Sequence, residues 1–217
     1  IESYLQLGDW QAVEQHHRFR YWVHRRELDR NSDEFVDACL VFANWETRSY
    51  KLDTDVRPIR ALRDALDALD AAYQVASENP SSHESRMVTI LNAQADANLN
   101  LALHMVNSGD DPITGGPVSG DDFGDIIERR NIILASFIRG GEALKRVITL
   151  SETRGEQIQH GLAIANLADW ELLFDRPQSS AKNYRRAYRL LKAAGLTDDE
   201  MLAEFGSPRQ MARFSVK

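Results

Sequence analysis

Residues 162–194 read LAIANLADWELLFDRPQSSAKNYRRAYRLLKAA, and two helices with a turn between them can be recognised in this segment. Apolar residues recur at helical spacing in both halves, and Asp175, Arg176 and Pro177 interrupt the pattern. Gly195 follows where a left-handed C-cap would end the second helix. The apolar positions are Leu162, Ala165, Leu167, Ala168, Leu172, Ala181, Tyr184, Ala187, Tyr188 and Leu191. Small residues among them allow two helices to approach closely, so the segment predicts a tightly packed helical hairpin.

The overall composition predicts a folded protein. The chain has 217 residues, 43% of them hydrophobic, which is enough for one substantial core or several repeat units. An excess of 33 acidic over 26 basic residues gives a net charge of −7, which argues against general attraction to nucleic acid or anionic lipid. No segment approaches the roughly 20 apolar residues that cross a bilayer. We therefore expect no binding to nucleic acid and no membrane span; the partner expected from the repeat resemblance given below is a protein or extended peptide.

The single cysteine and the first residue add two further expectations. Cys39 lies in the apolar run 35–43, so we expect a buried thiol with a packing role. The chain begins at Ile1 without an initiator Met or a signal sequence, and we expect that residue 1 is not the translated start.

Helical periodicity covers most of the remaining sequence. Six further helices are expected, at about residues 10–30, 33–50, 58–77, 81–107, 123–154 and 197–206. The helix at 33–50 is apolar almost all round, which predicts neighbours on several sides. Capping boxes are predicted at the starts of two helices, from Ser81 with Glu84 and from Thr197 with Glu200. The Gly- and Pro-rich segment 108–122 predicts a long mobile loop, and Gly140-Gly141 are expected to bend or interrupt the helix around them.

The hairpin at 162–194 resembles a tetratricopeptide repeat. The matching positions are Leu167 and Ala168 in the first helix and Tyr184, Ala187 and Tyr188 in the second. Ser180 and Lys192 depart from the pattern, which prefers Ala at the first position and often has Pro at the second. Residues 42–46 (FANWE) match residues 167–171 (LADWE) in residue type at every position, which indicates internal repetition. The turns lie farther apart than the standard period of about 34 residues, so the repeats are elongated or degenerate.

We therefore predict an all-α fold with tetratricopeptide-like antiparallel helix pairs stacked as a short right-handed solenoid. The repeat domain is expected to cover residues 1–206, including a C-terminal capping helix, and residues 207–217 to form a linker or tail. A compact irregular helical bundle is the alternative.

The wider chain resembles gammaproteobacterial proteins in which divergent tetratricopeptide repeats precede a short TonB-like C-terminal domain. The resemblance is carried by Ala43-Asn44-Trp45 with Tyr50, by residues 141–144 (GEAL) and by residues 167–195. Such proteins usually carry an export signal. The resemblance thus implies a periplasmic or envelope location, and a cytoplasmic location is the alternative.

A polar row on the helix at 81–107 gives the main candidate site. Asn92, Asp96, Asn100 and His104 are spaced by four, and each turns about 40° from the last, so they form a slanted stripe opposite the apolar face. Asn is a poor residue for helix interiors. In tetratricopeptide arrays the first helix of each pair lines a concave groove, so the resemblance implies that this row and Asp169 bind peptide. An exposed helix face without a ligand is the alternative.

The sequence gives weaker indications of metal binding and catalysis. Glu14 and His17, with His24 nearby, have the spacing of half a metal site in a helical bundle, but no second such pair exists. We expect no metal, cofactor or catalytic residue and predict a non-enzymatic binding scaffold. A metal-binding bundle or enzyme, and a purely structural module that positions a missing C-terminal domain, are the alternatives. The arginine-rich segment 18–30 is expected to be a solvated helix face with buried aromatics, or a surface for an acidic peptide.

Overall fold

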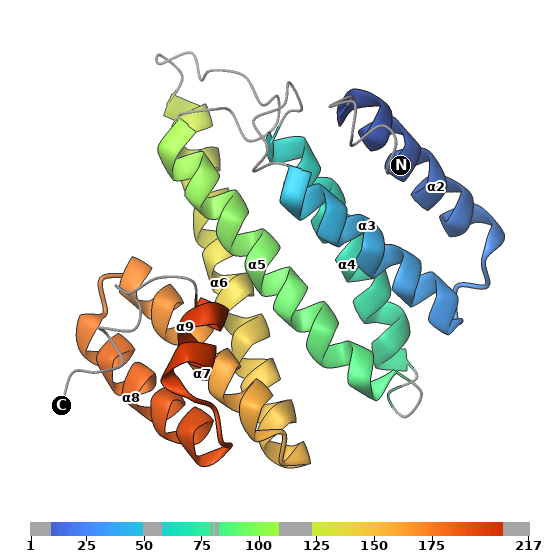
Figure 1. The fold of residues 1–217 in the computed structure, drawn as a ribbon. Helices are drawn as coiled ribbons and strands as arrows, with labels where there is room; N and C mark the ends of the chain where they lie inside the picture. Colours follow the sequence, from blue (N-terminus) through green and yellow to red (C-terminus); the bar gives the residue numbers. More distant parts are fainter. Residues whose placement is uncertain (1–9, 50–57, 79, 81–82, 109–122, 206–217) are drawn as a thin grey trace. The chain divides into compact units, whose positions relative to one another are not determined.

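The computed structural model describes residues 10–49, 58–78, 80, 83–108 and 123–205, which form eight α-helices and no strand (Figure 1). The helices are α2 (Trp10–Glu27), α3 (Asp33–Ser49), α4 (Pro58–Glu78), α5 (Glu84–Ser108), α6 (Phe123–Arg154), α7 (Gln157–Leu173), α8 (Pro177–Ala193) and α9 (Asp198–Phe205). The all-α prediction is confirmed for these ranges. The predicted loop at 108–122 lies, except for Ser108, outside the described residues, as do Ser81 and the predicted tail.

Several helix ends follow from local chemistry. The Ser32 hydroxyl accepts a hydrogen bond from the Phe35 amide at 3.2 Å and caps α3. The predicted box at α9 is confirmed, because the Thr197 amide donates to Glu200 Oε2 at 2.8 Å and the Glu200 amide donates to Thr197 Oγ1 at 3.2 Å. Gly195 has a φ of 93°, as its predicted C-cap role requires. Gly140-Gly141 do not interrupt the helix, since α6 continues through both residues.

The chain divides into two compact units at Gly140–Gly141, inside the predicted repeat domain. In the first unit, α3 packs against α2, α4 and α5, which confirms that it lies between neighbours (Figure 1). Its buried side chains include Phe35, Val36, Cys39, Leu40, Phe42 and Ala43. Burial raises the pKa of the Cys39 thiol to about 11, so this cysteine is protonated near neutral pH.

The second unit contains the predicted hairpin, formed by α7 and α8. Ala165 and Ala168 of α7 are fully buried and share a cluster with Tyr184 and Ala187 of α8. Ser180, at the position where the repeat pattern prefers Ala, is also buried. The turn contains a feature that the sequence did not reveal, because Asp175 adopts a φ of 55°, which is uncommon for a residue other than glycine.

At two glycines of this unit, a large side chain from another helix packs directly against the helix backbone. A Cβ atom at Gly161 would lie 2.7 Å from Leu191 Cγ, and one at Gly141 would lie 2.6 Å from the Trp170 ring. Neither distance is compatible with van der Waals contact. The absence of a side chain therefore sets the depth to which Leu191 and Trp170 pack.

Gly161→Ala is expected to lower the free energy of unfolding by about 1–3 kcal/mol, because the new methyl group overlaps Leu191. At an unconstrained helical position the same change raises the free energy of unfolding by about 1 kcal/mol. A decrease in this free energy would therefore indicate the overlap with Leu191. Urea unfolding measures the effect. In a Leu191→Ala background the clash is removed, and Gly161→Ala should become neutral or stabilising; equal destabilisation in both backgrounds would contradict this packing.

Candidate functional site

The predicted polar row lies along α5, but only Asp96 of its four residues is exposed. Asn100 is 9% exposed, and its Nδ2 donates to Asp96 Oδ1 at 3.0 Å. Asn92 and His104 are partly buried, and the Asn92 Oδ1 accepts no hydrogen bond from a described residue. The row is thus brought together on one helix, with two of its members bonded to each other.

Asp169, the fifth predicted peptide-binding residue, lies on α7 in the second unit. Its carboxylate accepts a hydrogen bond from the hydroxyl of Tyr184, whose side chain is buried between α7 and α8. Two residues along, Glu171 accepts from Ser179 Oγ at 2.7 Å and from Asn183 Nδ2 at 2.8 Å. These contacts give Asp169 a packing role within the hairpin.

An ion-pair network joins three helices of the first unit. Arg18 of α2 donates to Glu46 Oε2 of α3 at 3.0 Å and also to Asp64 of α4. The Glu46 side chain is fully buried, so its charge depends on this guanidinium. Arg18 therefore departs from the predicted solvated face and has a structural role.

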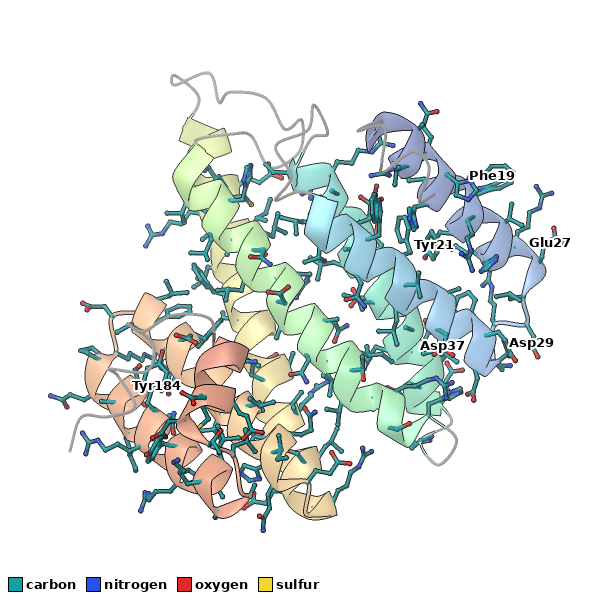
Figure 2. All side chains as sticks on the ribbon, viewed as in Figure 1. Phe19, Tyr21, Glu27, Asp29, Asp37 and Tyr184 are labelled. Carbon is teal, nitrogen blue, oxygen red and sulfur yellow. The ribbon has the colours of Figure 1, made fainter. Side chains whose placement is uncertain are left out.

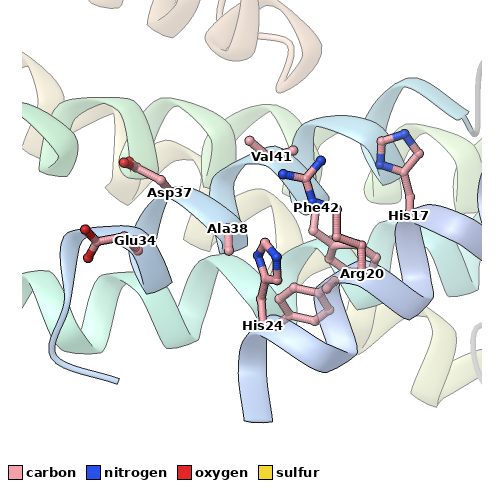
Figure 3. A pocket seen from close by; sticks show the side chains of 9 residues that line it. His17, Arg20, His24, Glu34, Asp37, Ala38, Val41 and Phe42 are labelled. Carbon is pink, nitrogen blue, oxygen red and sulfur yellow. The ribbon is translucent and has the colours of Figure 1, made fainter. Parts of the chain in front are cut away.

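A pocket of about 240 Å³ opens between α2 and α3 in the same unit (Figure 3). The α2 wall carries potentially cationic groups, the α3 wall carries carboxylates, and apolar side chains lie between them. Its lining consists of His17, Arg20, Tyr21, His24, Glu34, Asp37, Ala38, Val41 and Phe42. Tyr21 stacks on Phe42 with ring centroids 4.0 Å apart and fixes one side of the pocket.

The acidic wall is partly neutralised from within the fold. Arg86 of α5 forms two hydrogen bonds to Asp37, at 2.8 and 2.9 Å, and pairs with Asp33 at 2.9 Å. The hydrogen bonds from Arg86 lower the pKa of the Asp37 carboxyl and keep it ionised. Buried His83 lies 2.9 Å from the same Asp33, so the beginnings of α3 and α5 are tied together.

The basic wall contains two histidines, and one of them, His17, packs against an aromatic ring. His17 stacks on Trp45 with ring centroids 4.2 Å apart. Burial, together with the neighbouring His16 and Arg20, lowers the pKa of His17, which is therefore neutral at pH 7. The Glu14 side chain of the metal alternative lies outside the described part. Among the side chains that are described, no group of three His, Cys, Asp or Glu residues is placed to hold a metal ion.

Two aromatic side chains on α2 face solvent. Phe19 is 64% and Trp22 is 56% exposed, whereas Tyr21 between them packs towards α3 (Figure 2). The Arg26 guanidinium lies 5.3 Å from the Trp22 ring centroid. The prediction of buried aromatics is therefore correct for Tyr21 and wrong for Phe19 and Trp22. Since successive helical residues turn by 100°, residues 19 and 21 had to face different sides, a signal that the sequence already contained.

Neither protein-family models nor curated proteins match this chain. In the portion that the structure describes, no helix combines the length and the apolar character that crossing a membrane requires.

Arg18→Met is expected to lower the free energy of unfolding by about 3–5 kcal/mol, because it leaves the buried Glu46 carboxylate without this partner. Urea unfolding is the measurement. Arg60→Met is the control, since Arg60 is largely exposed and lies 3.8 Å from Asp64, and it should cost less than about 1 kcal/mol. Restoration of stability in Arg18→Met/Glu46→Met would support the network, whereas equal losses in the two single variants would contradict it.

Asp37→Asn is expected to destabilise the protein above about pH 5 and to matter progressively less as the pH falls towards 2. The sign follows because the folded-state pKa of Asp37 lies below its unfolded value, so its stabilisation is lost as pH falls through the folded pKa. Urea unfolding of both proteins between pH 7 and 3 measures the difference. Glu34→Gln, one turn away on α3, is the matched control. A pH-independent cost of Asp37→Asn would contradict the ion pair.

Proposed function

We propose that this chain is a non-enzymatic helical scaffold that binds another protein or an extended peptide. The observation that carries the proposal is the exposure of Phe19 and Trp22 on α2, beside the α2–α3 pocket. Aromatic residues are enriched where proteins bind one another, because a rigid ring buries a large apolar area at low entropic cost. Tyr21 and Phe42 already fill the space between the helices, so the two exposed rings are not needed for that packing.

The proposal includes a tetratricopeptide-like stacking of the helices and a groove lined by the polar row of α5. Support for the repeat comes from the small-residue packing of α7 against α8. Support for the groove comes from exposed Asp96, which could accept hydrogen bonds from a peptide backbone. A location in the bacterial envelope is proposed from the family resemblance alone.

The experiment is affinity capture from an extract of the source cell, followed by mass spectrometry. Wild type is compared with Phe19→Ser/Trp22→Ser and with Asn92→Ala/Asp96→Ala. Asp96 is changed because it is exposed, although it accepts a hydrogen bond from Asn100. Asn100 is left unchanged because it is buried, and Asp169 because it accepts a hydrogen bond from the buried Tyr184. Ile158→Ser, which alters an exposed aliphatic residue of α7, is the matched control. Circular dichroism and urea unfolding establish that every variant is folded.

We expect wild type and Ile158→Ser to retain the same defined set of proteins. The retained amount of these proteins should fall at least about tenfold with Phe19→Ser/Trp22→Ser. Loss with Asn92→Ala/Asp96→Ala instead would support binding but place it on α5. If wild type enriches no protein over bare resin, the binding proposal is wrong, and a purely structural module becomes the better account.

A further inference from the structure

The dimensions of the α2–α3 pocket restrict what it can hold. Its volume of about 240 Å³ lies below the roughly 300–1,000 Å³ of small-molecule and cofactor sites. An α-helix, with a diameter of roughly 10 Å, is also too wide to enter such a space. Val41 lines the pocket and is 53% exposed, so part of the apolar lining is open to a ligand. The pocket therefore suits one side chain from a partner that lies across α2.

Residues 18–30, the second half of α2 and the turn after it, have the opposite charge to the rest of the chain. They contain five arginines against Glu27 and Asp29, a net charge of +3, and +2 without Arg18, which is paired with Glu46 and Asp64. The whole chain carries −7, so the remainder carries −10. A basic segment on an acidic protein attracts acidic partners selectively, because the rest of the surface repels them.

The two carboxylates of the pocket are each stabilised within the fold, and Arg20 differs from them. Asp37 is neutralised by Arg86, and Glu34 lies in the first turn of α3, where a negative charge is favoured by the helix dipole. Arg20 stands in the middle of α2 and forms no ion pair with any residue that the structure describes. Its guanidinium extends into the pocket near Val41 and Phe42 (Figure 3). The cation is thus available to a ligand.

We propose that this surface binds an acidic segment of a partner protein that also carries apolar residues. A Glu or Asp side chain enters the pocket and accepts charge-assisted hydrogen bonds from Arg20, beside His24. Apolar neighbours in the segment pack on Phe19, which precedes Arg20 on the same helix, and on Trp22. This inference rests on the proposed function and names its partner class.

The test is fluorescence anisotropy with a labelled twelve-residue peptide composed of Glu, Leu and Phe. In the control peptide Gln replaces each Glu. We expect the acidic peptide to bind wild type and the neutral peptide to bind at least about tenfold more weakly. Binding of the acidic peptide should weaken with added salt.

Variants place the binding on α2. Arg20→Gln and Phe19→Ser should each lower the affinity for the acidic peptide by about tenfold. Arg20→Lys should lower this affinity less, because it keeps the charge. Arg185→Gln is the matched control, since it makes the same charge change at an exposed residue of α8, outside the pocket and outside residues 18–30, and should stay within about twofold. Circular dichroism checks that each variant is folded.

Several results would overturn the inference. These are absent binding, equal affinity for both peptides, and unchanged affinity in Arg20→Gln. Arg20-dependent binding only to phosphatidylglycerol vesicles or to a single-stranded oligonucleotide would assign the surface to another class of ligand. Arg20-dependent dimerisation in analytical ultracentrifugation would assign it to a second copy of the chain. Proteins captured through Phe19 and Trp22 but retained equally by Arg20→Gln would leave the scaffold function standing and remove only the acidic partner.

Discussion

The arrangement of the first unit depends on a single buried carboxylate. Glu46 is fully buried on α3, and the guanidinium that meets it comes from α2 and reaches Asp64 on α4 as well. A buried charge is tolerated only when its partner is held in place, so α2 cannot slide or rotate freely on α3. Because α2 is fixed in this way, Tyr21 faces Phe42 and the other side of the helix, with Phe19 and Trp22, faces solvent. The ion pair and the stacking of Tyr21 on Phe42 thus together hold the orientation of α2 in which its exposed aromatics face solvent.

The local features of the fold could be predicted from the sequence because their causes are local. The left-handed turn at Gly195, the box formed by Thr197 and Glu200, and the small residues between α7 and α8 each depend on neighbours within a few turns. The continuity of α6 through Gly140-Gly141 was missed, since propensity alone disfavours a glycine pair and packing against Trp170 favours it.

The candidate site could be predicted only in part, because its geometry depends on contacts between distant residues. Arg18 contacts Glu46 and Asp64, which lie 28 and 46 positions further along the chain. Helical periodicity gives the direction in which a side chain points but does not identify the residue that it meets. The same limit applies to the α5 row. Its spacing predicts one stripe on a helix, but the burial of Asn100 arises from tertiary packing. The charge of residues 18–30 can be read from the sequence. The sequence does not show that Arg18 pairs with Glu46 and Asp64, or that Arg20 forms no ion pair with a described residue.

The glycine contacts of the second unit also constrain how this sequence can diverge. A larger residue at 141 would be accommodated only if the ring at 170 became smaller, and the same holds for 161 and 191. Each pair is therefore expected to change together or not at all over evolutionary time. Among descendants of this chain, a covarying 141/170 pair would mark preservation of this helix packing even where overall sequence similarity has been lost.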